Sequence, residues 1–73
     1  MKIIIEIRSV YGENKAYPVC AAARHFADIA GTKTLTRRAL RSILAMGVTI
    51  EARSGIFAVN FGAGDDAKLP AVA

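Results

Sequence analysis

The chain has 73 residues, of which 10 are lysine or arginine and 6 are aspartate or glutamate, so its formal net charge is +4. Hydrophobic residues make up 53% of the chain and charged residues 22%. A chain of this length is one small domain whose core supplies only about 3–5 kcal/mol, which favours binding to a partner or to a second copy. Cys20 is the only cysteine and His25 the only histidine, which excludes an internal disulfide framework and a cysteine–histidine zinc site.

The apolar stretches are too short for a membrane span. The longest uncharged runs are 16–23, 42–50 and 54–64, well below the roughly 18 residues that a span needs. Glu6 interrupts the apolar start of the chain, so a signal peptide is not expected either. We therefore expect a cytoplasmic protein with no membrane partner and no cofactor.

Positive charge is concentrated in the middle of the sequence. Residues 24–53 hold six basic and two acidic residues, whereas the remainder is balanced. The basic residues of this segment are Arg24, Lys33, Arg37, Arg38, Arg41 and Arg53. Such a segment favours an acidic partner, either duplex DNA or an acidic protein surface.

The first half of the chain predicts a strand, a turn and a helix. Residues 2–10 alternate, with Ile3, Ile5 and Ile7 on one face of a strand. Residues 11–14 have turn chemistry, and 15–17 form a brief second strand. Pro18 suits the first turn of a helix over 19–30. Its core-facing positions are predicted to be Val19, Ala22, Ala23, Phe26, Ile29 and Ala30.

A second helix is predicted to follow a short connection. Gly31 ends the first helix as its C-terminal cap, and either Thr34 or Thr36 caps the start of the second. The second helix ends at Met46, and Gly47 closes it. Its buried stripe is predicted to be Leu35, Leu40, Ile43 and Leu44.

The pattern then changes to that of a β-hairpin. Residues 48–53 and 56–61 alternate as two strands, with Phe57, Val59 and Phe61 on one face of the second. Phe26, Phe57 and Phe61 are expected to fill the core. Residues 62–73 lack apolar periodicity and are expected to form a flexible tail. The sequence thus predicts one α+β domain over 1–61, with two helices packed on a small antiparallel sheet formed by an N-terminal strand or hairpin and a C-terminal hairpin.

The order of two helices and a hairpin resembles a winged helix-turn-helix domain. The resemblance covers residues 26–61 and rests on the sequences ADIAG at 27–31, LTRRALR at 35–41 and LAMGV at 44–48. Thr32 and Arg37 depart from the apolar residues usual at their positions in that family. The resemblance implies binding of duplex DNA, with the second helix in the major groove and the hairpin near the phosphate backbone. The chain is also similar to short phage and mobile-element proteins, which transfer no residue role.

The second helix also carries positive charge at its N-terminal end, where the helix dipole is unfavourable for it. Arg37 and Arg38 lie in its first turn, where the helix dipole makes each positive side chain unfavourable by up to about 1 kcal/mol. Arg41 repeats the charge one turn later. A phosphate at this end would reverse the sign of the effect. The candidate nucleic-acid-binding residues are Lys33, Thr34, Thr36, Arg37, Arg38, Arg41, Ser42 and Arg53.

No catalytic or metal-binding constellation is found in the sequence, and an enzyme is not expected. The alternative to a DNA-binding regulator is a protein-interaction module or inhibitor that docks on an acidic protein surface or adds a strand at a sheet edge. A homodimer would help DNA binding by reading two half-sites. The two functions differ in geometry, because DNA binding needs Arg37, Arg38 and Arg41 to project together with Arg53 at a flanking hairpin tip.

Overall fold

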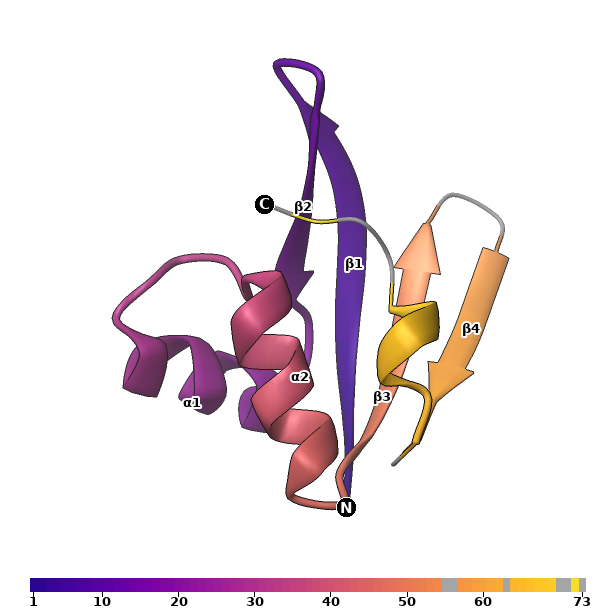
Figure 1. The fold of residues 1–73 in the computed structure, drawn as a ribbon. Coiled ribbons are helices and arrows are strands. Elements are labelled where there is room, and N and C mark those ends of the chain that lie inside the picture. The colour runs from indigo at the N-terminus through magenta and orange to yellow at the C-terminus, as the bar shows by residue number, and fades with distance from the viewer. Residues whose placement is uncertain (55–56, 63, 70–71, 73) are drawn as a thin grey trace.

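The computed structural model describes residues 1–54, 57–62, 64–69 and 72. Two helices pack on a four-stranded sheet with strand order β2-β1-β3-β4 (Figure 1), which confirms the α+β class. The elements are β1 (Lys2–Val10), β2 (Glu13–Pro18), α1 (Ala21–Ala30), α2 (Arg37–Ala45), β3 (Thr49–Ser54), β4 (Phe57–Phe61) and a short 3-10 turn, η1 (Asp66–Lys68). No helix in the described ranges is long and apolar enough to cross a membrane.

Strands β1 and β2 form a tight antiparallel hairpin. Tyr11 and Gly12 both have positive φ angles, 52° and 81°, as a two-residue hairpin turn requires. The second strand is longer than predicted, and Pro18 pairs with Ile5 at its end instead of starting the helix. Because β2 is an edge strand, a proline that lacks a backbone donor is tolerated there.

The central pair of strands runs parallel, so the sheet is mixed and the prediction of a wholly antiparallel sheet is wrong. Ile3 lies beside Ile50 and Ile5 beside Ala52 in the β1–β3 pair. Both helices lie in the connection between these two strands. A helical crossover of this length returns the chain in the original direction, which places β3 parallel to β1.

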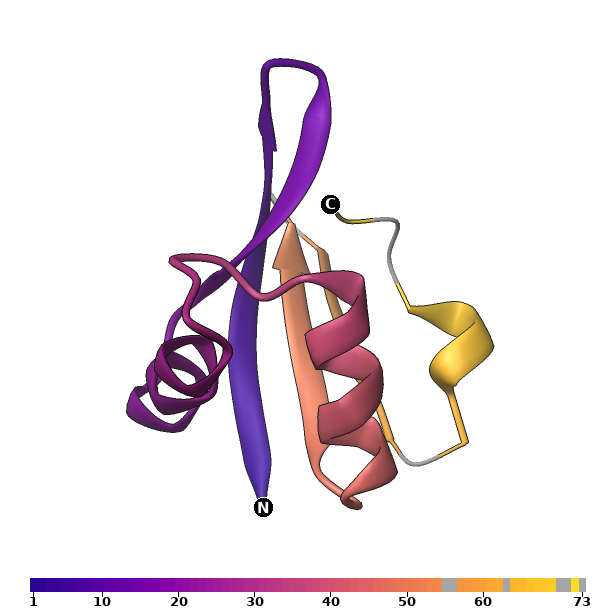
Figure 2. The ribbon, with the colours of Figure 1, turned by 60° about the vertical axis from the view of Figure 1, so that its left-hand side comes forward.

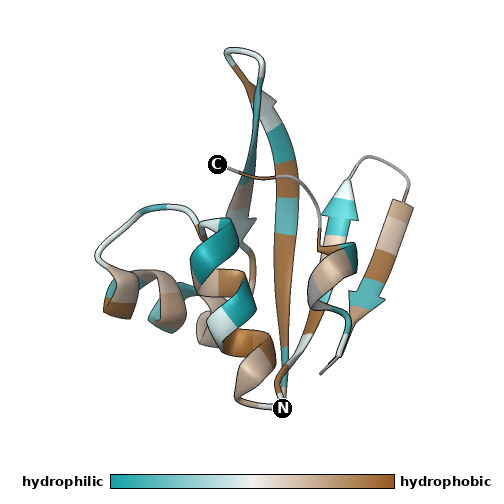
Figure 3. Ribbon diagram, in the orientation of Figure 1, coloured by the Kyte–Doolittle hydropathy of each residue, from teal (hydrophilic) through white to brown (hydrophobic). Residues whose placement is uncertain are grey.

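One face of the sheet carries the core and the helices. Ile3, Ile5 and Ile50 are fully buried, and they belong to one cluster with Leu40 and Leu44 of α2. Figures 1 and 2 show both helices on this face, and in Figure 3 hydropathy alternates in the upper half of β1, above a continuous hydrophobic stretch. Over that stretch burial alternates, since Ile3 and Ile5 are buried and Ile4 is only half-buried. The predicted alternation of β1 is therefore confirmed.

Helix α1 begins later than predicted and turns a different face to the sheet. Its N-cap is Cys20, and Gly31 ends it in the left-handed conformation expected of a cap. Ala23 and Ala27 are buried, but Ile29 is 82% exposed. The prediction that Ile29 faces the core is wrong. Ile29 follows the buried Ala27 by two residues, which places its side chain more than half a turn away around the helix.

Helix α2 follows the prediction closely. The Thr36 hydroxyl accepts a hydrogen bond from the Ala39 N–H at 3.2 Å and caps the helix. Leu40, Ile43 and Leu44 are buried. Leu35 is buried as well, but it precedes the helix and its N–H donates to the Ala16 carbonyl of β2 at 2.8 Å, so the prediction that it belongs to the stripe of the helix is wrong. The connection between the helices is thus held to the edge of the sheet.

Two of the three β4 side chains that the sequence predicts to face the core are exposed. Phe61 is buried, but Phe57 is 70% exposed and Val59 is 49% exposed. Helix α1 packs on β1 and β2, while α2 packs on β3. Since β4 is the outermost strand beyond β3, the helices leave its start uncovered, and the prediction that Phe57 fills the core is wrong.

The described part of the segment after β4 packs on the domain. Leu69 is only 5% exposed and joins the core, and Val72 packs against that core. The Arg37 guanidinium donates a hydrogen bond to the Leu69 carbonyl at 3.0 Å, and the Gly62 N–H donates to the Asp65 carboxylate at the same distance. Flexibility of this tail stays a prediction, but its described residues are not detached.

Candidate binding surface of the helix layer

The sheet face that points away from the helices carries paired charges. Glu51 binds both Lys2, with 3.8 Å between Nζ and Oε1, and Arg53, with 3.0 Å between Nη2 and Oε2. Glu6 binds Arg8 at 3.0 Å. Two acidic side chains thus compensate most of the positive charge of three basic ones over β1 and β3.

Arg8 has a second partner on this face. Its guanidinium carbon lies 5.1 Å from the centre of the Tyr17 ring, within the range of a cation–π contact. The hydrogen bond and the charge of Glu6 raise the pKa of Arg8 above its ordinary value. Glu6 therefore stabilises the charged form of Arg8.

The helix layer, by contrast, has an excess of positive charge. We define it as residues 21–45, which comprise α1, α2 and their connection. It contains five basic side chains and a single acidic one, Asp28. The basic residues are Arg24, Lys33, Arg37, Arg38 and Arg41. The net charge of the molecule therefore belongs to its helix layer.

Arg53 does not join the arginines of α2. On β3 the side chains of Ile50 and Ala52 are buried toward the helices, so the alternation of the strand turns Glu51 and Arg53 to the opposite face. The ion pair between Arg53 and Glu51 lies on that face as well. The geometry that the winged-helix expectation requires of Arg53 is therefore not found.

The arginines of α2 differ in burial and in their partners. Arg37 is half-buried and reaches the Leu69 carbonyl, so a backbone acceptor partly compensates its charge in the first turn. Arg41 also has an interaction partner within the chain. Arg38 is exposed and lies on the side of α2 that faces α1. Only one of the three thus borders the space between the two helices.

The remaining predicted site residues divide into structural and exposed groups. Thr36 caps α2, and the Thr34 carbonyl accepts a hydrogen bond from the Thr32 hydroxyl. Lys33 and Ser42 are exposed. The predicted residues that share the solvent-facing side of the helix layer are therefore Lys33, Arg38, Arg41 and Ser42.

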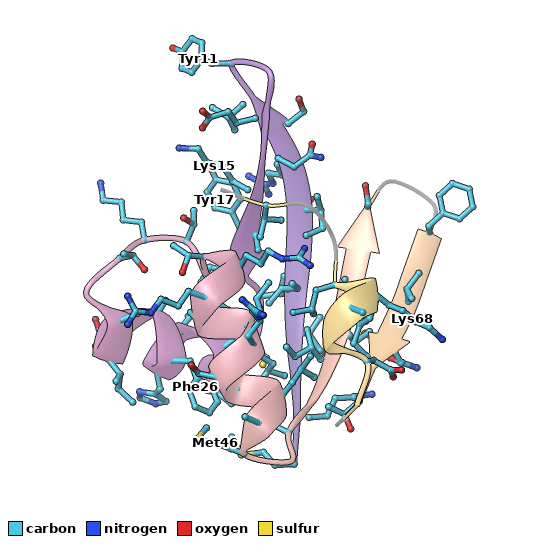
Figure 4. All side chains as sticks on the ribbon, in the orientation of Figure 1. Tyr11, Lys15, Tyr17, Phe26, Met46 and Lys68 are labelled. Atoms are coloured by element: carbon cyan, nitrogen blue, oxygen red, sulfur yellow. The ribbon has the colours of Figure 1, made fainter. Side chains whose placement is uncertain are left out.

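A cleft of about 480 Å³ lies between α1 and α2. Two of its residues, Ile29 and Met46, are large apolar side chains that are 82% and 61% exposed. Figure 4 shows Phe26 of α1 near Met46, which follows α2. The cleft is lined by Phe26, Ile29, Ala30, Thr32, Thr36, Arg38, Ala39, Ser42, Ile43 and Met46.

Sequence reasoning missed this cleft because it assigned Ile29 to the core. The available signal was that α1 has two apolar faces, one formed by Ala23 and Ala27 and the other by Phe26 and Ile29. Of the α1 side chains, only the small alanines Ala23 and Ala27 are buried against the sheet. The larger residues are left for the gap beside α2, and the helix periodicity alone does not show which face is which.

Cys20 has a structural role at the start of α1. Its sulfur accepts hydrogen bonds from the Ile4 N–H at 3.3 Å and the Ala23 N–H at 3.4 Å. Burial acts to raise the pKa of the thiol, but these backbone hydrogen bonds outweigh it and hold the pKa below the ordinary value. Among the described residues no group of three or more histidine, cysteine or acidic side chains is placed to hold a metal ion.

The arrangement as a whole suits binding. It combines a positively charged layer, an apolar cleft and one arginine at the border of that cleft. Comparison of the chain with protein-family models, with curated proteins and with solved structures found no match.

Proposed function

We propose that the chain is a small non-catalytic interaction module whose helix layer binds an acidic surface of a partner protein. The observation that carries this proposal is the separation of charge between the two faces. On the outer face of the sheet Glu6 and Glu51 form ion pairs with three basic side chains, whereas the helix layer holds one acidic residue among five basic ones. Such a layer attracts an acidic partner and orients it.

The cleft favours a protein over DNA as that partner. Protein interfaces are enriched in methionine, aromatic residues and arginine, and the cleft brings Met46, Phe26 and Arg38 together. Interfaces with DNA are more polar and depend on many phosphate contacts. Because Arg53 lies on the other face and Arg37 reaches the chain's own Leu69, fewer arginines are grouped than a recognition helix with a wing would offer.

Duplex DNA stays the second candidate, carried by the exposed face of α2 with Arg38, Arg41 and Ser42. Binding of either partner fits the cytoplasm, where the free thiol of Cys20 would stay reduced. The two candidates predict different dependence on salt and on substitution, so that one titration separates them.

The test is a titration followed by amide chemical shifts, with polyglutamate and with short random-sequence duplex DNA over a range of salt. We expect polyglutamate at low salt to shift the amides of the helix layer and to leave those of the outer sheet face unchanged. Arg38→Glu should weaken this binding about fivefold to tenfold, as expected for a change of about 1 kcal/mol. The matched control Arg53→Glu reverses a charge on the opposite face and should have little effect.

Two results would contradict the proposal. One is the absence of polyglutamate binding at low salt in protein that melts cooperatively. The other is DNA binding that persists near about 150 mM salt and is lost when Arg38 and Arg41 are replaced together, since that pattern indicates phosphate contacts made by α2.

A further inference from the structure

We infer that the cleft between α1 and α2 is a groove for one amphipathic helix of the partner protein, with apolar side chains on its floor and an acidic side chain at Arg38. This inference rests on the proposed function, and it adds the structural class of the partner.

The floor of the groove is apolar and uncovered. Ile29 and Met46 are largely exposed, while Ile43 beside them is buried and Phe26 is partly buried. Phe26 and Ile29 belong to α1, whereas Ile43 belongs to α2 and Met46 follows it, yet all four side chains line one cleft. Burial of two such large exposed side chains is a favourable contribution that this domain alone does not realise.

The shape of the groove suits a helix. On α2 and its C-terminal cap, the lining residues Ala39, Ile43 and Met46 recur at spacings of four and three, so they form one stripe along the helix. On α1, Ile29 and Ala30 lie three and four residues after Phe26, so these three residues share one side of the helix over one turn. Two flanking helical stripes form a groove into which the side-chain ridges of a third helix pack. A helix bound in this way presents apolar residues at positions i, i+3 or i+4, and i+7.

The charge at the border selects an acidic helix. Arg38 lines the cleft, is exposed, and makes no ion pair with any residue in the described part of the chain. Asp28, the one acidic residue of the helix layer, does not line the cleft. An aspartate or glutamate on the bound helix would therefore give Arg38 a partner close to apolar surface, where water screens the pair less.

The same charge disfavours a second copy of this chain as the occupant. Two helix layers that faced each other would bring like charges together, including both copies of Arg38. The exposed apolar residues of β4, Phe57 and Val59, belong to a different part of the surface and have no charged residue within their strand. They serve instead as controls.

The test is a selection from a displayed library of peptides of mixed helical and alternating apolar patterns, performed on the full chain. We expect enrichment of peptides with apolar residues at i, i+3 or i+4, and i+7 and with acidic residues beside them. Ile29→Glu should reduce their affinity at least about tenfold, because it places a negative charge on the groove floor. Since Ile29 is exposed, this variant should melt at nearly the temperature of the parent chain.

A charge exchange makes the test specific. Arg38→Glu should weaken the selected acidic peptides and restore binding to versions whose acidic residue at one position is replaced by lysine. Val59→Glu, which alters an exposed apolar residue on β4, should leave peptide affinity unchanged. Enrichment of alternating, strand-forming peptides that Val59→Glu abolishes would overturn the groove and indicate strand addition at β4.

Failure of the groove is distinguishable from failure of the proposed function. If acidic peptides are enriched without helical periodicity and bind Ile29→Glu as well as the parent chain, the groove is wrong while binding of an acidic partner stands. If no acidic peptide is enriched from the library, both are wrong, and retention of duplex DNA by the same protein would identify the alternative.

Discussion

The thiol of Cys20 shows how one residue depends on segments distant in sequence. As the N-cap of α1 it accepts the Ala23 N–H, and it also accepts the Ile4 N–H from the middle of β1. Serine, threonine, aspartate and asparagine are the usual caps, and a cysteine in this place is held to the sheet as well as to its helix. Both hydrogen bonds stabilise the thiolate more than the thiol.

We therefore expect the Cys20 thiol to titrate at a lower pH in the folded protein than in the unfolded chain. A group whose folded pKa is depressed contributes stability above its unfolded pKa and loses that contribution as the pH falls through the folded pKa. The free energy of unfolding should thus rise with pH between the two pKa values. The ultraviolet absorbance of the thiolate measures the titration, with the urea-unfolded chain as reference. A Cys20→Ser variant with the same pH dependence of stability would contradict the expectation.

Thr36 is a second residue whose role is local. Thr36→Ala removes the side-chain oxygen that accepts the Ala39 N–H and should lower the free energy of unfolding by about 1 kcal/mol. Urea denaturation measures the change. The control Ser42→Ala, on the exposed side of the same helix, should fall within about 0.5 kcal/mol of the parent chain. Equal effects of both substitutions would show that the cap is not formed.

At the scale of elements, α1 and α2 differ in how well their sequence specifies their orientation. In α2 the large apolar residues Leu40, Ile43 and Leu44 lie on one face, so the buried side is unambiguous. In α1 the apolar residues surround more than half of the helix. The sheet selects the small face with Ala23 and Ala27, because their size permits close packing, and this leaves Ile29 outside.

The same substitution at one position in each helix tests this assignment. Ile43→Val should lower the free energy of unfolding by about 1 kcal/mol, because it removes a methylene group from a side chain that is only 3% exposed. Ile29→Val should change it by less than about 0.5 kcal/mol. Thermal or urea denaturation of both variants measures the difference, and a larger loss at Ile29 would contradict the orientation of α1.

At the scale of the whole molecule, the segment after β4 completes the core. Phe61 and Leu69 are both buried in the one apolar cluster. The predicted flexibility of residues 62–73 was based on their lack of apolar periodicity, which a single anchoring leucine does not provide. A short segment can still pack when one large side chain fills a gap that the helices leave.

Leu69→Ala should therefore lower the free energy of unfolding by about 2 kcal/mol or more. In so small a domain this is a large share of the total stability, so the melting temperature should fall clearly. The control Lys68→Ala, at an exposed neighbouring position, should have little effect. An unchanged melting temperature for Leu69→Ala would show that the segment is loose, as its composition predicts.

The local features of this protein are readable from its sequence. The alternation in residues 2–10, the caps at Gly31 and Thr36 and the stripe of α2 each depend on neighbours within one or two turns, so their chemistry is readable from short patterns. The exposure of Arg38, Arg41 and Ser42 followed from the same stripe. The α+β class followed from the order of these elements.

The packing of the elements against one another depends on the tertiary structure. The parallel pairing of β1 with β3, the face that α1 turns outward and the side of the sheet on which Arg53 lies depend on contacts between residues far apart in the chain. Those contacts are selected by the size and fit of side chains across the core, which no local period records. The cleft between α1 and α2 is a consequence of that packing, because the two apolar faces of α1 do not show by themselves which one turns to the sheet.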